Sequence, residues 1–338
     1  MISVRSVRVD DPRAVALWQE LSAELEERYG GPEVQFPIRP DGLVLSLLAL
    51  TEDDEPVGTA VVRWSVYHPD RPGTVEIKRL FVRPEHRGNG YARVMMGAIE
   101  RAAFRVGATR LVLETGQAQP EAVALYQGIG YTRIPSYGTY AEDARSICMA
   151  KAIPTRLLVV NGAMGAGKTA TASAIRDVLG EAGVRVAFID ADALCQATPE
   201  PSNDPYQQHL LMLALAAIAP IYRARGYGCV VVARVVEDPD DRERYARVFA
   251  SPAGPAQVSV VRVAATEETR AERITAREPE GKWREFGLHR SRELDEILEG
   301  LDLDDAVVTT DATTREDVAR QVLDAAGWWI PGTETLAQ

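Results

Sequence analysis

The chain has 338 residues and a formal net charge of −11; 46% of its residues are hydrophobic and 26% are charged. This composition excludes a disordered or collagen-like chain, and at roughly 100 to 200 residues per domain the length predicts two domains. No apolar run reaches the about 20 residues that span a bilayer, and residues 1–8 lack a signal-peptide pattern. We therefore expect a soluble, cytoplasmic protein without a membrane partner.

The cysteines and the charge distribution narrow the class further. The three cysteines lack the spacing of a disulfide framework or a zinc site, which agrees with a reducing compartment. Most of the net negative charge lies after residue 152. Because nucleic-acid binding depends on Lys and Arg meeting phosphates, we predict no nucleic-acid partner. An oligomer is compatible with these observations.

Hydrophobic patterning predicts a mixed α/β domain over residues 1–152, followed by a short Pro-containing linker at residues 153–155. The elements expected in chain order are a strand at 2–8, a helix opening at Asp11-Pro12, strands at 43–50, 57–67 and 74–82, a helix at 90–105, a strand at 110–114, a helix at 121–127, and closing strands between 131 and 149.

The second half, residues 156–330, alternates apolar strands with helical stretches, and residues 331–338 are expected to form a tail. Continuous β-branched strands separated by helices indicate a parallel sheet covered on both faces, whose ligands bind at the carboxyl ends of the strands. The strands are expected at 157–160, 184–189, 229–236, 258–263 and 306–309.

A motif of the form G-x-x-x-x-G-K-[ST] lies between the first strand and the first helix of the second half. There, consecutive backbone N–H groups converge on a phosphate at the positive end of a helix. Lys168 is expected to bridge the β- and γ-phosphates, and the Thr169 hydroxyl to bind Mg²⁺. A plain glycine turn is the alternative, which this context disfavours. The predicted nucleotide-binding residues are Gly162, Ala163, Met164, Gly165, Ala166, Gly167, Lys168, Thr169 and Ala170.

Two acidic residues, Asp190 and Asp192, follow the next predicted strand, which we place beside the strand that enters the glycine loop. One carboxylate can hold Mg²⁺ through water while the other accepts the proton of an attacking hydroxyl. We assign Asp192 as the base and Asp190 as the metal ligand. The alternative is a pair of solvated acids that cap the following helix.

Three arginines further along, Arg270, Arg273 and Arg277, are spaced by three and four residues and so share one helical face. In a closing lid, such arginines neutralise charge that develops on a transferred phosphoryl group. We predict this catalytic role for Arg273 and Arg277, with residues 278–292 completing the lid. A solvated face paired with neighbouring glutamates is the alternative.

On these motifs the second half resembles the P-loop kinases of small molecules, with the chloramphenicol phosphotransferase, adenylylsulfate kinase and shikimate kinase branches as the nearest types. The resemblance implies a parallel α/β sandwich, ATP, Mg²⁺ and a hydroxylated acceptor, and it places Asp311 near the adenine. One departure concerns the strand at 229–236, which ends in Arg234 without a clear Walker-B aspartate. The alternatives are that Arg234 binds the substrate, or that Glu237 or Asp238 takes the place of the missing acid.

A second glycine loop, at residues 87–92, follows the predicted strand at 74–82 and opens a helix. Its backbone N–H groups again point at an anion, although the pattern R-x-x-G-x-[GA] alone is equally typical of a left-handed turn. The neighbouring segments Val75–Val82, Leu111–Thr115 and Ala122–Tyr131 extend the pattern. With them, residues 1–151 resemble the GNAT N-acetyltransferase family.

This resemblance implies a GNAT-type mixed α/β sheet and binding of acetyl-CoA. It assigns the backbone of Leu80 and Val82 to the pantetheine arm and Tyr126 to protonation of the departing thiolate. The amine must lose a proton before it attacks a thioester, and we choose Glu76 as the base and Glu114 as the second candidate. Either carboxylate could instead be a cross-strand partner of a basic residue. The loop residues implied to bind the pyrophosphate are Arg87, Gly88, Asn89, Gly90, Tyr91 and Ala92.

Together these patterns predict a bifunctional transferase that acetylates an amine and phosphorylates a hydroxyl, in natural-product tailoring or antibiotic resistance. The substrate is expected to be a small-molecule amine, an alcohol, or both. Three alternatives stay open: a nucleotide-binding domain that regulates the acetyltransferase without being a kinase, a modifier of polynucleotides or proteins, and an acetyltransferase half that is only a structural partner.

Overall fold

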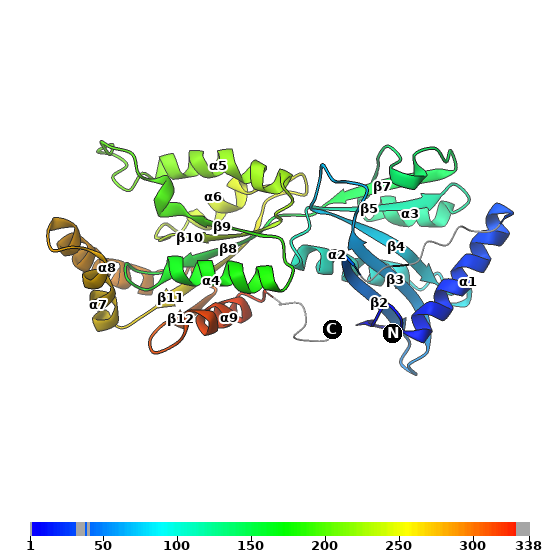
Figure 1. Ribbon diagram of the computed structural model, residues 1–338, viewed down its shortest axis with the longest axis horizontal. Coiled ribbons are helices and arrows are strands. Elements are labelled where there is room, and N and C mark those ends of the chain that lie inside the picture. Colours follow the sequence, from blue (N-terminus) through cyan, green and yellow to red (C-terminus); the bar gives the residue numbers. More distant parts are fainter. Residues whose placement is uncertain (1, 32–37, 39–40, 329–338) are drawn as a thin grey trace. The chain divides into compact units, whose positions relative to one another are not determined.

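The computed structural model describes residues 2–31, 38 and 41–328, and the chain divides into two compact units between Ile153 and Pro154 (Figure 1). Both units are α/β, which confirms the predicted fold class of two α/β domains. The predicted tail at residues 331–338 and the predicted domain end at residue 330 lie outside the described residues. No helix within the described part is long and apolar enough to cross a membrane.

The first unit contains a seven-stranded sheet in the order β1-β2-β3-β4-β5-β7-β6. The β4–β5 pair is parallel, and the other neighbouring pairs are antiparallel. The strands are β1 (Ser3–Ser6), β2 (Leu43–Leu50), β3 (Pro56–Trp64), β4 (Thr74–Val82), β5 (Arg110–Gly116), β6 (Thr132–Arg133) and β7 (Ser146–Ala152). The helices are α1 (Pro12–Tyr29), α2 (Tyr91–Arg105) and α3 (Pro120–Gly128), with short 3₁₀ turns η1 (Pro84–His86) and η2 (Gly138–Tyr140).

Helices α1 and α2 cover opposite faces of this sheet. Alternation along β2 sends Leu47 into the core beneath α2 and Leu48 into the core beneath α1. Helix α1 begins where the Asp11 side chain accepts a hydrogen bond from the Arg13 N–H at 2.9 Å, and it ends at Gly30 in the left-handed conformation. Its C-terminal turn lies near the end of β5, because the Tyr29 hydroxyl accepts a hydrogen bond from the Ala118 N–H at 3.3 Å.

The middle of the sheet is split between β4 and β5. Their pairing runs from Thr74↔Arg110 to Ile77↔Leu113 and ends there, although β4 continues to Val82. The β3–β4 register also shifts in this region, and Arg79 adopts a positive φ of 54°. A bulge of this kind bends its strand and is concentrated next to functional sites. The bend opens the sheet where β4 and β5 part.

The second unit contains a five-stranded, entirely parallel sheet in the order β12-β11-β8-β10-β9. Helices cover both of its faces with separate apolar cores, as predicted. The strands are β8 (Arg156–Asn161), β9 (Val186–Asp190), β10 (Cys229–Ala233), β11 (Gln257–Ala264) and β12 (Ala306–Thr309). The helices are α4 (Lys168–Glu181), α5 (Gln208–Ala224), α6 (Asp241–Val248), α7 (Glu267–Arg277), α8 (Lys282–Glu299) and α9 (Arg315–Ala325), and η3 (Ala191–Leu194) is a short 3₁₀ turn.

The strand order corrects one prediction. Asp190 ends β9, but β9 does not lie beside β8, the strand that enters the glycine loop. The connection from β8 through α4 to β9 leaves one strand position in the sheet between β8 and β9, and β10 later occupies it. Ala233 of β10 therefore pairs with Asp190 on one side and with Val160 on the other. The backbone of Arg234, the residue after β10, therefore lies between the ends of the strands that lead to the loop and to the two acids.

Candidate active sites

The loop at residues 87–92 connects η1 to the first turn of α2, and its residues 88–90 are exposed. Gly88 and Gly90 have φ values of 79° and 77°, and a Cβ added at either would meet no atom within 4 Å. Among the described residues, no hydrogen-bond acceptor is recorded for the backbone N–H groups of residues 88–92. The loop therefore offers a row of unused donors in open space at a helix start, which fits a diphosphate.

The Arg87 side chain is turned away from this row of donors. Its Nε donates to the Val82 carbonyl at 2.9 Å, and its Nη2 lies 2.5 Å from the Glu24 carboxylate. Leu80 lines the cavity described next, whereas Val82 is not among the residues that line it. The predicted roles of these residues in coenzyme binding stay predictions.

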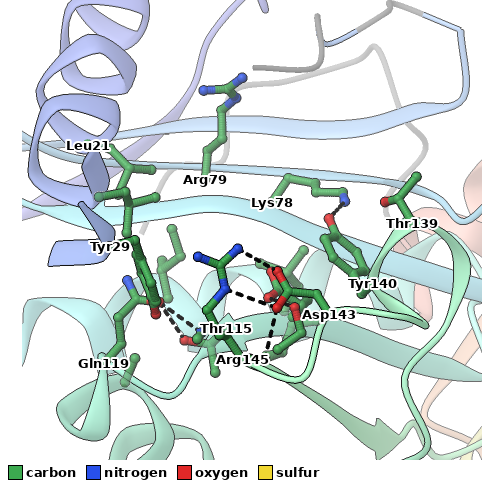
Figure 2. A pocket seen from close by; sticks show the side chains of 18 of the residues that line it. Leu21, Tyr29, Lys78, Arg79, Thr115, Gln119, Thr139, Tyr140, Asp143 and Arg145 are labelled. Carbon is green, nitrogen blue, oxygen red and sulfur yellow. Dashed lines mark hydrogen bonds and ion pairs between the residues drawn. The ribbon is translucent and has the colours of Figure 1, made fainter. Parts of the chain in front are cut away.

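A cavity of about 570 Å³ opens where β4 and β5 separate (Figure 2). Ile77 and Leu80 line it from β4, and Leu113 and Gly116 line it from β5. The remaining residues that line it come mainly from the end of α1, from α3, and from the segment between η2 and β7. The cavity thus lies at the split and is bordered by both strands.

Two carboxylates of this domain have very different surroundings. Glu76 is 1% exposed; its carboxylate accepts a hydrogen bond from Tyr137 at 3.1 Å and pairs with Lys78 at 2.8 Å. Glu114 lines the cavity and accepts a hydrogen bond from the Ser146 hydroxyl at 2.7 Å. Burial raises the pKa of Glu114 above its usual value, which suits a group that must take up a proton. The geometry therefore favours our second candidate base over the first.

Tyr126 lies on α3 and lines the same cavity with 6% of its surface exposed. Burial, and then the nearby charge of Glu114, raise the pKa of its hydroxyl. Such a phenol stays protonated at neutral pH and can give its proton to a stronger base that develops beside it. An acid and a base thus face the cavity from α3 and β5.

The glycine loop of the second domain leads from β8 into α4, as the motif predicts. Its entry is fixed by Asn161, which sequence reasoning did not single out. This fully buried amide accepts from the Gly162 N–H at 2.8 Å and from the Val236 N–H at 2.9 Å, and donates to the Val236 carbonyl. The sequence feature that could have identified Asn161 is its position as a polar residue at the end of an apolar strand. Among the described residues, no acceptor is recorded for the backbone N–H groups of Ala163, Met164, Gly165 and residues 167–170.

The Lys168 side chain lies inside this loop and is 9% exposed; its Nζ donates to the Ala163 carbonyl at 3.1 Å. Burial lowers the pKa of Lys168 to about 8, partly against the charge of Asp192, which raises it. A phosphate group placed beside the ammonium would restore its full charge. The loop therefore fits a nucleotide phosphate.

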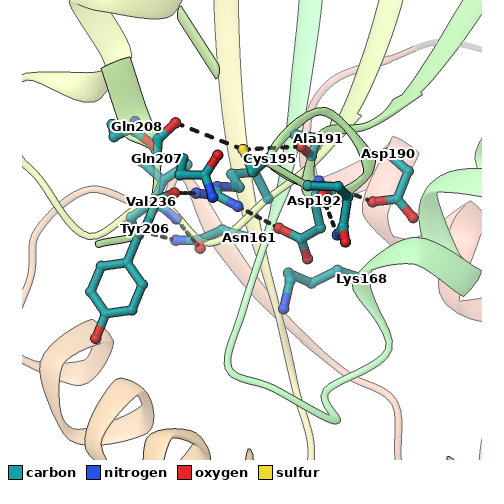
Figure 3. A network of polar contacts seen from close by, with 12 residues as sticks. Asn161, Lys168, Asp190, Ala191, Asp192, Cys195, Tyr206, Gln207, Gln208 and Val236 are labelled. Carbon is teal, nitrogen blue, oxygen red and sulfur yellow. Dashed lines mark hydrogen bonds and ion pairs between the residues drawn. The ribbon is translucent and has the colours of Figure 1, made fainter. Parts of the chain in front are cut away.

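Figure 3 shows the two acids next to Lys168, and Arg234 joins their polar network through Asp192. Asp190 accepts from the Asp192 N–H at 3.2 Å, and the Asp192 carboxylate lies 2.5 Å from the Arg234 guanidinium. Arg234 also donates to the Tyr206 carbonyl at 3.0 Å. Asp192 therefore faces both Lys168 and Arg234, while its side chain stays 55% exposed. It can meet a substrate hydroxyl that approaches from solvent.

The predicted arginine face divides in two. Arg273 donates to the Gly165 carbonyl at 3.2 Å and to the Thr310 hydroxyl at 2.9 Å, so it touches the loop. Arg277 is 61% exposed and pairs with its neighbour Glu278. Arg270 is instead buried and pairs with Asp295, so it does not join the other two at the site. Helix α8 begins inside the predicted lid and is tied to the loop, because Ser291 donates to the Met164 carbonyl at 2.8 Å.

Two further predictions concern the nucleotide and the metal. Asp311 accepts from the Thr266 N–H at 2.9 Å and so joins the end of β12 to the start of α7. No group of three or more potential metal ligands occurs among the described residues. Mg²⁺ is commonly held by one or two protein groups together with phosphates. The roles of Thr169 and Asp190 as metal ligands stay predictions.

Comparisons with known proteins assign both halves. Residues 7–131 match the model of the Acetyltransferase (GNAT) family, and residues 157–300 match the model of an AAA domain. An IAA acetyltransferase from Azospirillum brasilense is 35% identical over 94 residues, which are 28% of this chain and 61% of that protein. An uncharacterized N-acetyltransferase from Schizosaccharomyces pombe is 29% identical over 119 residues, 35% of this chain and 72% of that protein. This chain thus spans less than two thirds of the length of the Azospirillum relative.

Among solved structures, a GNAT-family acetyltransferase from Staphylococcus aureus matches with a TM-score of 0.37 at 12% identity, covering 45% of this chain and 99% of that one. On the two family models, the chain combines a GNAT acetyltransferase domain with a kinase-like P-loop domain, as the two motif sets predict. The GNAT fold implies binding of acetyl-CoA, and the P-loop suggests binding of a nucleotide.

Proposed function

We propose that the chain is a bifunctional enzyme, an acetyl-CoA-dependent N-acetyltransferase joined to an ATP- and Mg²⁺-dependent phosphotransferase that acts on a hydroxyl. The observation that supports the first activity most directly is the cavity in the split sheet, which Glu114 and Tyr126 both line. The observation that supports the second activity most directly is the buried side chain of Lys168, which lies close enough to Asp192 for that carboxylate to raise its pKa.

In the acetyltransferase domain, the backbone N–H groups of residues 88–92 would hold the diphosphate of the coenzyme, whose thioester supplies the acetyl group. Glu114 removes a proton from the acceptor ammonium in the cavity, so that the nitrogen gains a lone pair for attack. As the C–N bond forms and the C–S bond breaks, Tyr126 would donate its proton to the leaving sulfur, and the second proton that the nitrogen loses would pass through solvent to the tyrosinate. Glu76 holds Lys78 and Tyr137 in place and does not take part in proton transfer.

In the P-loop domain, Lys168 and the backbone N–H groups of the loop would bind the phosphates of ATP, with Thr169 and Asp190 toward Mg²⁺. ATP would supply the phosphoryl group. Asp192 accepts the proton of the acceptor hydroxyl, and Arg234 orients its carboxylate. Arg273 lies at the loop and Arg277 beside it, and both neutralise charge on the transferred group. We place the two activities in the modification of small polyfunctional molecules, as in natural-product tailoring or antibiotic inactivation, inside the cell.

The test is mass spectrometry of a library of small amines and alcohols incubated with the full chain, acetyl-CoA and ATP. We expect some compounds to gain an acetyl group and others, or the same ones, to gain a phosphoryl group. Gly90→Glu should abolish only the first change, because a carboxylate would occupy the phosphate-binding loop. Asp192→Asn should abolish only the second while ATP binding is retained. Loss of neither product in these variants would refute the assigned sites.

One observation favours a second candidate, in which the P-loop domain binds nucleotide and regulates the acetyltransferase without being a kinase. The tip of β10 is followed by Arg234 and not by an acid. This candidate predicts ATP binding without ADP release for any acceptor, and an acetylation rate that changes with ATP. Release of ADP that depends on both an acceptor and Asp192 would exclude it.

A further inference from the structure

The charges around the acetyltransferase cavity are unbalanced. Four cationic side chains line it against two carboxylates, Glu114 and Asp143; the four are Arg63, Lys78, Arg79 and Arg145. Figure 2 shows that two of these cations have acidic or phenolic neighbours within the site: Arg145 pairs with Asp143, and Lys78 points at Tyr140. Lys78 also pairs with the buried Glu76. Glu114 has its own pKa raised by burial, so its negative charge is itself disfavoured.

Arg63 differs from the other cations. No carboxylate of the described residues lies within ion-pair distance of it, and its Nε is buried without a hydrogen-bond partner. A guanidinium that no carboxylate pairs with can form a charge-assisted hydrogen bond with an anionic acceptor. Since Arg63 also lines the cavity, an anionic group of a ligand is the partner that its position favours.

The sheet register places Arg63 on the same face as Glu114. Arg63 on β3 is directly opposite Glu76 on β4, and Glu76 is opposite Val112 on β5, two residues before Glu114. Two strand spacings and two residue steps separate Arg63 from Glu114, roughly 12 Å between their Cα atoms. Both residues line the cavity, and this separation matches a short acceptor with an amine at one end and an anion at the other.

We propose that the acceptor of the acetyl group is a small amine that also carries a carboxylate, with the carboxylate bound by Arg63 and the amine held at Glu114. This inference rests on the proposed acetyltransferase activity and names its substrate class. A diamine or polycation would bring a second ammonium against Arg63 and would be repelled. The cavity therefore selects amino acids of short chain length over cationic amines.

The test compares three matched series with acetyl-CoA: short ω-amino carboxylates, their carboxamides, and diamines of the same length, with thiol release as the readout. We expect kcat/KM to be highest for the carboxylates. Arg63→Gln should raise KM for the carboxylates by about 10- to 100-fold, the loss expected for one charge-assisted hydrogen bond, with kcat within about threefold. KM for the carboxamides should not change. Arg133→Gln, an exposed arginine on the edge strand β6, is the matched control and should behave as the wild type.

Each other outcome is decisive. Equal kcat/KM for carboxylates and carboxamides, or equal KM in the Arg63→Gln and Arg133→Gln variants, would overturn the proposal. Better turnover of amino phosphates than of amino carboxylates would overturn the choice of carboxylate. If no amine is acetylated although acetyl-CoA binds, the proposed function fails. In that case the role of Arg63 is tested separately, by calorimetric titration of the coenzyme-A-loaded chain with the carboxylates. Binding to the wild type that is lost in Arg63→Gln supports the role. No binding to the wild type, or equal binding to the variant, refutes it.

Discussion

The assignment of the base can be tested by exchanging each of two carboxylates for its neutral isostere. Glu114→Gln keeps the hydrogen bond from Ser146, because the amide oxygen can still accept it, but cannot take a proton. A general base contributes typically 10²- to 10⁴-fold to a rate, so we expect kcat for acetylation to fall by about 100-fold or more. Glu76→Gln should leave kcat within a fewfold among the molecules that remain folded.

The effects of the two exchanges on stability should be opposite. Folding raises the pKa of Glu114, so its ionisation costs stability as the pH rises through the folded value. Glu114→Gln removes this cost, and the variant should melt at the wild-type temperature or above it at pH 7. Glu76→Gln leaves Lys78, which is 26% exposed, without its buried partner at 2.8 Å. Breaking such a pair costs about 3 kcal/mol, or roughly 6–12 °C in the melting temperature of this domain.

The assays are the pH profile of kcat/KM by thiol release and the thermal unfolding of the full chain. In the wild type, activity should rise with pH because Glu114 must be ionised, with an inflection above 4.5, the ordinary value for a glutamate. Glu114→Gln should lose this limb, and Glu76→Gln should keep it. A wild-type profile in Glu114→Gln, or loss of the limb in Glu76→Gln alone, would refute the assignment and return the role to Glu76.

Three further predictions concern single residues. Because burial lowers the pKa of Lys168 to about 8, nucleotide binding above that pH should require the uptake of a proton. The affinity for nucleotide, measured by calorimetry, should then fall by about tenfold for each pH unit above the pKa. An affinity that does not change from pH 7 to 10 would contradict this. Gly165→Ala should abolish nucleotide binding, because residue 165 has a φ of +81° and an added Cβ would lie 2.7 Å from the Arg270 carbonyl oxygen. The control is Gly180→Ala, which should bind nucleotide normally because a Cβ there meets no atom within 4 Å. Tyr126→Phe should lower kcat for acetylation by about 100-fold or more with KM unchanged. An unchanged kcat would show that another group protonates the thiolate.

Local motifs made both phosphate-binding loops predictable from the sequence. A glycine-rich loop between a strand and a helix requires only neighbouring residues, so the loops at 87–92 and 162–169 could be placed without knowledge of the tertiary fold. The parallel sheet of the second half could be predicted for the same reason, because its strands are continuous apolar runs. These features depend on a single stretch of chain each.

The relations between distant segments could not be predicted in this way. Nothing in the sequence indicates that β10 would enter between β8 and β9, so the contact of Arg234 with Asp192 was not expected. Glu76 and Glu114 lie on neighbouring strands with the same alternation, and the sequence does not show that Tyr137 and Lys78 would contact the carboxylate of Glu76. Similarly, helical spacing placed Arg270 with Arg273, whereas the packing of α8 buries Arg270 against Asp295.

The central claim is that one chain carries two independent sites, one for a coenzyme diphosphate and one for a nucleotide. Calorimetric titration of the full chain with coenzyme A and with ATP tests it most directly, in the wild type, in Gly90→Glu and in Lys168→Ala. We predict one molecule of each ligand per wild-type chain, loss of coenzyme A alone in Gly90→Glu, and loss of ATP alone in Lys168→Ala. Failure of either ligand to bind the wild type, or loss of both ligands in one correctly folded variant, would contradict the account.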